Sequence, residues 1–452
     1  MASDTRSMPT TPAELHARID ANWFGLLVGV TTALVSLVTV FLFSQNPFYV
    51  NKDSALFQHA GWWITEGGRL YVDIWDLKPP LIYFVTTVLA VVSVGDMALL
   101  HVLSIALTVV VVVGGVILVG VLTHRLTDDG LASLVTGVTM FILASLYAFP
   151  VAGIRPKYFA FLCGVAGLLL AVDDRPFFSG LIGAAAAGFW QLGAPVALLV
   201  VGIGLQRGGA RGAGRTIAGG LTMTALTVLP FVLTGRTTAL FVETVLAPVY
   251  GVERYSVVGR LLLVGIEFGY GVAVIPLAIY GWGRGLATDA ARYWWVAVGG
   301  VLYLGQVFLE FQGAIELVLL FVFLALGVGV AIADAATPRR RSLIAVGVVL
   351  LVVTSAYWQV AAAPPLKDDL EVAYEDEDVP NYESLPESPE GWPSMQEIYW
   401  EKQQPEHCHY RLGLKQQYFE QQTGGSLYKS TCGQWPFAEP PVQWFGSQLS
   451  PF

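Results

Sequence analysis

The sequence predicts an all-α polytopic membrane protein with a small C-terminal extension outside the membrane. Hydrophobic residues make up 55% of the 452 residues and charged residues only 13%, and the mean hydropathy is +0.60. These values lie outside the range of ordinary soluble domains. Apolar runs of roughly 20 residues, the length that crosses a hydrocarbon core of about 30 Å, recur as far as Val360. The lipid bilayer is therefore the first expected partner, and no nucleic acid is expected.

The expected helices form a bundle of about eleven transmembrane segments. Gly193 and Pro195 interrupt the longest run, which is a broken helix or two short ones. Pro79 and Pro80 start the second helix, where a missing N–H costs little. Met1–Asp20 is polar and no small-residue cleavage site follows the first apolar run, so no cleavable signal peptide is expected. The expected helices are 24–44, 79–95, 98–122, 131–149, 156–172, 177–206, 216–235, 258–281, 292–310, 314–334 and 342–361.

The distribution of arginines predicts the orientation. Loops 206–215 and 337–342 carry three arginines each and are separated by an even number of expected spans, so both lie on one side, which the positive-inside rule makes cytoplasmic. This predicts a cytoplasmic segment 1–22, a transmembrane domain 23–361 with its first outer loop at 45–80, and an extracytoplasmic tail 362–452. The same count places Arg155 and Lys157 inside, where they would be topology anchors only; a catalytic part for them requires a different count of spans.

The tail differs in composition from the rest of the chain. From residue 362 onward it has 15 acidic and 5 basic residues. Its first part reads as an acidic linker and its aromatic second part as a small helical cap. Cys408 and Cys432 would face an oxidising compartment, where they can form a disulfide. The adjacent side chains of 407–409 lack a second ligand cluster, so no metal site is predicted; no cofactor is required, and a divalent metal has no ligand motif to support it.

The first outer loop holds most of the polar groups outside the tail. Asp53 starts an amphipathic juxtamembrane helix that Gly67 and Gly68 end, and the following segment runs along the membrane surface. Its aromatic residues are typical of a headgroup belt. Asp53 and Lys78 stand at helix ends beside the membrane surface, where a carboxylate and an ammonium are placed to meet a lipid headgroup.

The stretch KDSALFQHAGWWITEGGRLYVDIWDLKPPLIYF, residues 52–84, resembles the first extracytoplasmic loop of the GT-C glycosyltransferases that use polyprenyl-phosphate sugars. That superfamily includes protein O-mannosyltransferases and the lipid A aminoarabinose transferase. Within it, the wording DIWDLKPP, the length and the acidic tail are most similar to archaeal dolichyl-phosphate-mannose mannosyltransferases. The resemblance implies a GT-C-type bundle and a membrane glycosyltransferase. It also implies a dolichyl-phosphate sugar donor, mannose as the sugar, and a glycan acceptor on a lipid or surface glycoprotein in N-glycosylation.

This chemistry needs a base for the acceptor hydroxyl and cations for the departing lipid phosphate. We expect Asp53 to be the general base of a single-displacement, inverting reaction. Lys78 is the first phosphate partner, followed by Arg69 and Lys52. Arg254 either joins them or forms a rim ion pair with Glu253. The family has a second acidic residue in this loop, and Glu66, Asp73 and Asp76 all compete for that position. With His59 added, the candidate substrate-binding residues are Lys78, Arg69, Lys52, Arg254, Asp73, Asp76, Glu66 and His59.

Two other classes stay open at this stage. A lipid-linked-sugar flippase or another transporter would need ionisable groups near the bilayer midplane, and the polar residues beside later spans, Gln191, Glu267, Glu310 and Glu316, form no obvious relay. A noncatalytic subunit of a glycosylation complex is the other alternative. Mutation of Asp53 separates these classes, because only the enzyme loses sugar transfer.

Overall fold

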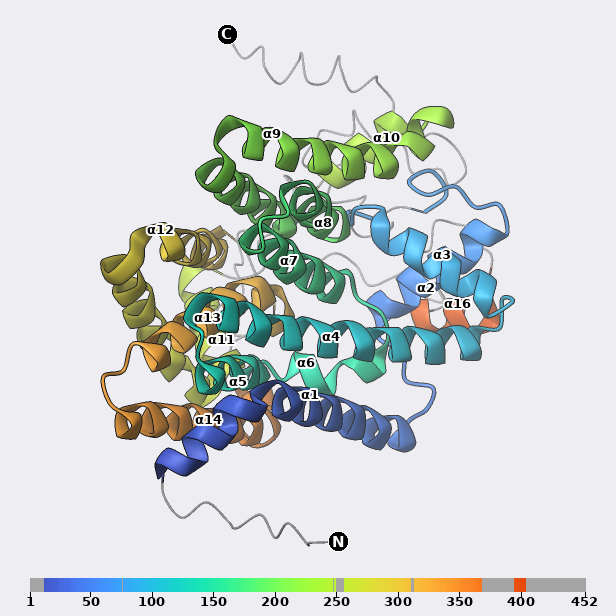
Figure 1. The fold of residues 1–452 in the computed structure, drawn as a ribbon. Helices are drawn as coiled ribbons and strands as arrows, with labels where there is room; N and C mark the ends of the chain where they lie inside the picture. Colours follow the sequence, from blue (N-terminus) through green and yellow to red (C-terminus); the bar gives the residue numbers. More distant parts are fainter. Residues whose placement is uncertain are drawn as a thin grey trace, which may run out of the picture.

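The computed structural model of the protein describes residues 12–74, 76–246, 248, 256–309, 313–367 and 394–403, and these ranges are almost entirely helical (Figure 1). The one extended pairing within them is an isolated bridge between Leu70 and Ile74. This confirms the all-α fold class. The helices are α1 Pro12–Gln45, α2 Lys52–Thr65, α3 Leu81–Val92, α4 Met97–Thr127, α5 Gly130–Thr139, α6 Ser145–Ala148, α7 Pro156–Val172, α8 Pro176–Phe189, α9 Ala194–Leu233, α10 Thr237–Phe241, α11 Val257–Phe268, α12 Val274–Leu309, α13 Val318–Ala333, α14 Pro338–Ala361 and α16 Met395–Glu401.

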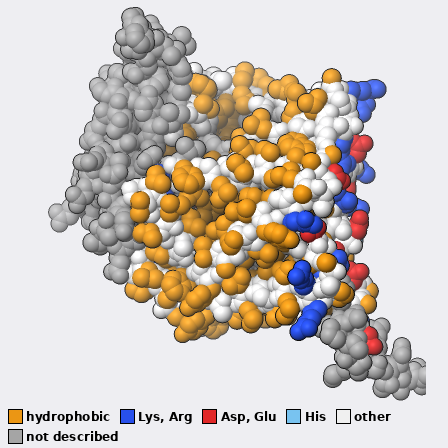
Figure 2. Space-filling model, turned by 90° about the vertical axis from the view of Figure 1, so that its left-hand side faces the viewer, with side chains coloured by type: hydrophobic (Ala, Val, Ile, Leu, Met, Phe, Trp, Pro, Cys, Tyr) orange, Lys and Arg blue, Asp and Glu red, His pale blue; other side chains and the backbone are white. Residues whose placement is uncertain are grey.

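The core of the bundle is α13, whose side chains are buried over nearly its whole length. It packs against α12, α4 and α5. Helices at the outside expose large apolar side chains such as Leu37, Val110 and Leu233, and Figure 2 shows a broad apolar surface of this kind. Within the described residues, six helical stretches are long and apolar enough to cross a membrane, and four further apolar helices are shorter. The number of spans expected from the sequence remains a prediction.

Charged contacts define one end of the bundle, which we call the arginine end. Arg341 pairs with Asp129 at 2.8 Å, and Arg284 pairs with Asp334 at 2.7 Å. The middle of α9 reaches the same end, because Gln206 donates to the carbonyl of Ala291. Ala291 follows the break in α12 at Asp289, on the same helix as Arg284. Both arginine-rich loops therefore lie together, as the parity argument required, and Figure 2 shows charged side chains gathered along one edge. That this end faces the cytoplasm remains a prediction.

The expected second span, 79–95, is wrong as a membrane crossing. α3 begins after Pro80 as predicted, but it lies alongside α2: the rings of Phe57 and Tyr83 are 5.9 Å apart, and a Cβ on Gly95, beyond the end of α3, would lie 3.5 Å from the Trp62 indole. Both ends of α3 are therefore at the end of the bundle that carries the first outer loop, which we call the loop end. A run of apolar residues predicts the length of a helix, whereas the orientation of that helix relative to the membrane depends on the helices that it packs against.

The expected span 177–206 is two helices that meet at Trp190, an alternative that the sequence left open. α8 ends at Phe189, a 3₁₀ turn Gln191–Gly193 follows, and α9 starts at Ala194. α9 itself reverses direction at Gly209, which has φ +56°. One crossing fewer at α3 and one more here offset each other, so the parity of every later helix is unchanged. Between α3 and Trp190, each segment lies at the opposite end of the bundle from the one that the sequence predicts. Residues 153–159 are therefore at the loop end.

Candidate active site at the loop end

The N-terminus of α2 carries Asp53. The side chain of Asn51 caps the helix by accepting a hydrogen bond from the Asp53 N–H at 3.0 Å. Asp53 is half-buried in the first turn, where the helix dipole favours a negative charge. Glu66 caps the other end, and Gly67, with φ +100°, ends the helix as the sequence predicts. The local sequence therefore presents one carboxylate at the positive end of a short, rigid element.

The loop before α7 packs directly on this helix. The Asn51 N–H donates to the Ala152 carbonyl at 3.3 Å. Gly153 has φ +96°, and a Cβ there would lie 2.3 Å from Ser54 Oγ and 2.8 Å from Gln58 Nε2. Only glycine fits this close approach. Residues 153–159 are thus at the loop end beside Asp53, which corrects the prediction that they are cytoplasmic anchors.

This loop brings two cations to the site. Lys157 pairs with Glu316 at 2.6 Å, its ammonium lies 5.7 Å from the Trp190 ring, and it is within electrostatic reach of Lys78 and Arg155. The Nε of Arg155 is buried and has no hydrogen-bond partner among the described residues. A buried guanidinium N–H without an acceptor is costly unless an anion meets it. Lys78 and Arg155 therefore both lie within electrostatic reach of Lys157, although they come from two distant segments.

The backbone around Lys78 is fixed by buried polar side chains. The Tyr71 hydroxyl donates to the Lys78 carbonyl at 2.7 Å, and Gln191 donates to the Leu77 carbonyl at 2.5 Å. The Asp76 N–H donates to Glu243 Oε2 at 3.0 Å. Burial raises the pKa of Tyr71 well above its usual range, so its hydroxyl stays protonated as a donor. These three hydrogen bonds fix the backbone of residues 76–78 and therefore the position from which the Lys78 side chain extends.

Asp76 itself is buried, with 2% of its surface exposed, and accepts a hydrogen bond from the Tyr83 hydroxyl. Glu243, which the sequence did not single out, is fully buried beside it. Gln191 was noted only as a possible transporter residue. Glu243 and Gln191 are polar residues that follow or interrupt apolar runs. This interruption of the hydrophobic pattern is the one signal in the sequence that points to them. Their grouping with residues 76–78 comes from tertiary contacts alone.

The remaining predicted site residues lie along α2 and in the turn that follows it. Arg69 forms a bidentate pair with Asp73, with its closest contact at 2.8 Å, in the turn after the far end of α2. Lys52 and Glu66 are exposed at the two ends of α2. The His59 Nε2 donates to the Gln403 carbonyl at 3.0 Å, and burial lowers the pKa of His59 to about 4. His59 is therefore neutral at pH 7 and contacts the tail.

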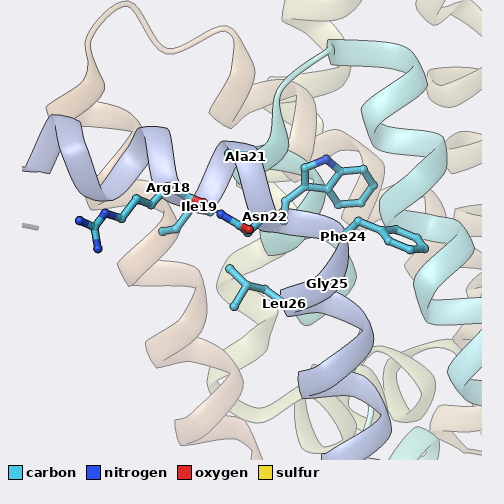
Figure 3. Close-up of a pocket in the computed structure, with 8 residues that line it drawn as sticks. Arg18, Ile19, Ala21, Asn22, Phe24, Gly25 and Leu26 are labelled. Carbon is cyan, nitrogen blue, oxygen red and sulfur yellow. Dashed lines mark hydrogen bonds between the residues drawn. The ribbon is translucent and has the colours of Figure 1, made fainter. Parts of the chain in front are cut away.

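Several predictions fall outside the described residues: those on Arg254, Cys408 and Cys432, together with the acidic linker and most of the cap. Among the residues that the structure does describe, no group of three His, Cys, Asp or Glu side chains is placed to hold a metal ion. The hollow drawn in Figure 3 is lined by residues 18, 19 and 21–26 of α1. It lies near the arginine end, because neighbouring Asp20 accepts from the Gly130 N–H, and so is not part of this site.

The chain is similar in sequence and in fold to known proteins. A family model described as DolP-mannose mannosyltransferase matches residues 67–229. A curated dolichol phosphate-mannose mannosyltransferase of Haloferax volcanii is 28% identical over 439 residues, covering 90% of this chain and 96% of the relative. Among solved structures, ArnT from Cupriavidus metallidurans, determined with bound undecaprenyl phosphate, shares the fold with a TM-score of 0.51. It is 13% identical, and the match covers 88% of this chain and 76% of ArnT.

The ArnT match establishes the helical architecture, and the two sequence matches establish the kind of enzyme. The family match begins in the first outer loop and includes Lys78, Arg155 and Lys157. The curated relative extends over nearly the whole chain. The chain is therefore a membrane glycosyltransferase that resembles the dolichol-phosphate-mannose mannosyltransferases in sequence and shares the helical fold of ArnT.

Proposed function

We propose that the protein transfers mannose from a dolichyl-phosphate donor to an extracytoplasmic glycan acceptor of surface-protein N-glycosylation. The observation that carries this proposal is the packing of the Gly153 loop on the N-terminus of α2. It packs the first turn of α2, which carries Asp53, against the segment that leads into Arg155 and Lys157. The donor and sugar follow the two mannosyltransferase matches, and the bound undecaprenyl phosphate of ArnT supports a lipid phosphate as the leaving group.

The proposed reaction is one displacement at the anomeric carbon. Asp53 removes the proton from the acceptor hydroxyl as its oxygen attacks, and the bond from the anomeric carbon to the phosphate oxygen breaks. The sugar is thereby transferred with inversion, and dolichyl phosphate leaves with the extra negative charge. Lys78, Lys157 and Arg155 stabilise that charge. The buried Nε of Arg155, which has no hydrogen-bond partner among the described residues, suits an anionic oxygen.

The placement of ionisable groups argues against the transporter alternative. Glu316 pairs with Lys157 at the loop end. Glu267 pairs with Lys367, just beyond the end of α14, at 2.6 Å. Gln191 contacts residues 77 and 244 at the same end. A transporter would need such groups near the middle of the membrane.

The experiment uses the purified full-length protein and a short-chain dolichyl-phosphate mannose. Asp53→Asn keeps the size of the side chain but not its basicity, so the transfer rate should fall by roughly 10² to 10⁴. Lys78→Ala should instead weaken donor binding and slow the reaction together. Asp174→Asn, at an exposed carboxylate in the turn between α7 and α8, is the matched control and should react at the normal rate. An Asp53→Asn enzyme that keeps more than about a tenth of the rate would contradict the assignment of the base.

A further inference from the structure

A short segment of the tail returns to the bundle and packs on the helix that carries Asp53. α16 has seven residues, starts with a capping box at Ser394, and buries Met395, Ile398 and Tyr399. Its contacts are with α2 and with the start of α4. A helix this short is unstable alone in water, so its structure depends on that packing. We call residues 394–403 the clasp.

The clasp bonds to the middle of α2 through Tyr399. This side chain is fully buried, and its hydroxyl lies 3.0 Å from Gln58 Oε1 and 2.5 Å from the Met97 carbonyl. The amide of Gln58 in turn donates to Ser54 Oγ at 2.8 Å. Ser54 follows Asp53 and faces Gly153. A continuous set of hydrogen bonds thus runs from the tail to the contact between α2 and the Gly153 loop.

A second set of contacts fixes the clasp at its other side. His59, next to Gln58, donates to the Gln403 carbonyl at 3.0 Å, and the Gln403 N–H closes α16 by donating to Ile398. The Trp400 ring packs 5.7 Å from Phe48, in the segment just before α2. The clasp therefore contacts α2 itself and the chain that leads into it.

We propose that the clasp positions α2 for catalysis, with Tyr399 as the positioning residue. A buried hydroxyl that joins α2 to the start of α4 restricts sliding of α2 against the bundle. Such sliding would displace Asp53 from the Arg155 loop, and reactions of this kind are sensitive to displacements of about 1 Å. The inference rests on the proposed role of Asp53. It assigns a part in the reaction to a tail segment more than 300 residues away.

The test compares full-length Tyr399→Phe with Tyr357→Phe, which removes the same hydroxyl from a side chain that is 72% exposed on α14. Tyr399→Phe should lower the maximal transfer rate by roughly tenfold. Its affinity for dolichyl phosphate should be unchanged, because Lys78, Lys157 and Arg155 are on other elements. A residue that serves folding alone would reduce the rate and donor binding in parallel.

Hydrogen exchange supplies a readout that does not depend on activity. In Tyr399→Phe the amides of residues 51–59 should exchange faster than in the wild type, while those of α13 should not change. A normal rate with unchanged exchange in α2, or a parallel loss of rate and donor affinity, would overturn the proposal. Failure of the wild type to use dolichyl-phosphate mannose would instead refute the proposed function, and the exchange result would still decide whether the clasp holds α2.

Discussion

Gly153 gives the most direct test of the packing between the two halves of the site. Its φ of +96° and ψ of −164° lie in a region that only glycine occupies readily. An alanine Cβ would lie 2.3 Å from Ser54 Oγ, 2.8 Å from Gln58 Nε2 and 3.0 Å from Ser104 Oγ. Backbone strain of about 1–3 kcal/mol and overpacking of about 1–3 kcal/mol together predict that Gly153→Ala lowers the free energy of unfolding by about 2–6 kcal/mol.

The same substitution should reduce the transfer rate, because the added methyl group pushes the Arg155 loop away from Asp53. The free energy of unfolding is measured by denaturant titration in mixed micelles, and the rate with dolichyl-phosphate mannose. Gly29→Ala is the matched control: this helical glycine of α1 has no atom within 4 Å of an added Cβ, and alanine there should be neutral or stabilising by about 0.5–1 kcal/mol. If Gly153→Ala unfolds and reacts like this control, the loop does not pack on α2 as described.

The remaining predictions concern an ion pair, a histidine and the topology. Lys157→Met removes the ammonium that pairs with Glu316 at 2.6 Å and should lower the free energy of unfolding by about 1.5–3 kcal/mol; Glu316→Gln should cost less in the Lys157→Met background than alone, and additive losses would contradict the pairing. The pKa of His59 is about 4 in the folded protein against 6.5 unfolded, so the unfolded chain binds the extra proton between these values. Acidification from pH 7 to 4 should therefore remove up to roughly 3 kcal/mol of stability in the wild type, and His59→Gln should lose less; parallel Tm curves would refute this. Val94→Cys, at a position 91% exposed after α3, should react with an impermeant thiol reagent from the outside while Ser342→Cys stays protected; protection of both would restore the crossing at 79–95.

Local sequence determined the class of the protein and the first half of the site. Low charge and long apolar runs predict a membrane bundle, because transfer into lipid depends on composition. The start of α2 near Asp53 and its end at Gly67 follow from capping and glycine chemistry within a few residues. The outer-loop pattern was sufficient to indicate the superfamily.

Tertiary contacts decided which segments meet that half. Hydropathy measures how well a segment partitions into lipid, and it does not distinguish a crossing helix from α3, which lies along α2. Counting α3 as a crossing reverses the expected side of every later residue up to Trp190, where the second miscount cancels the first. Arg155 and Lys157 lie between these two positions, so the count placed them at the wrong end of the bundle. The docking of Tyr399 on Gln58, 341 positions apart, depends on complementary buried surfaces. Neither surface shows a pattern of its own, so only the folded chain brings the tail to the helix that carries Asp53.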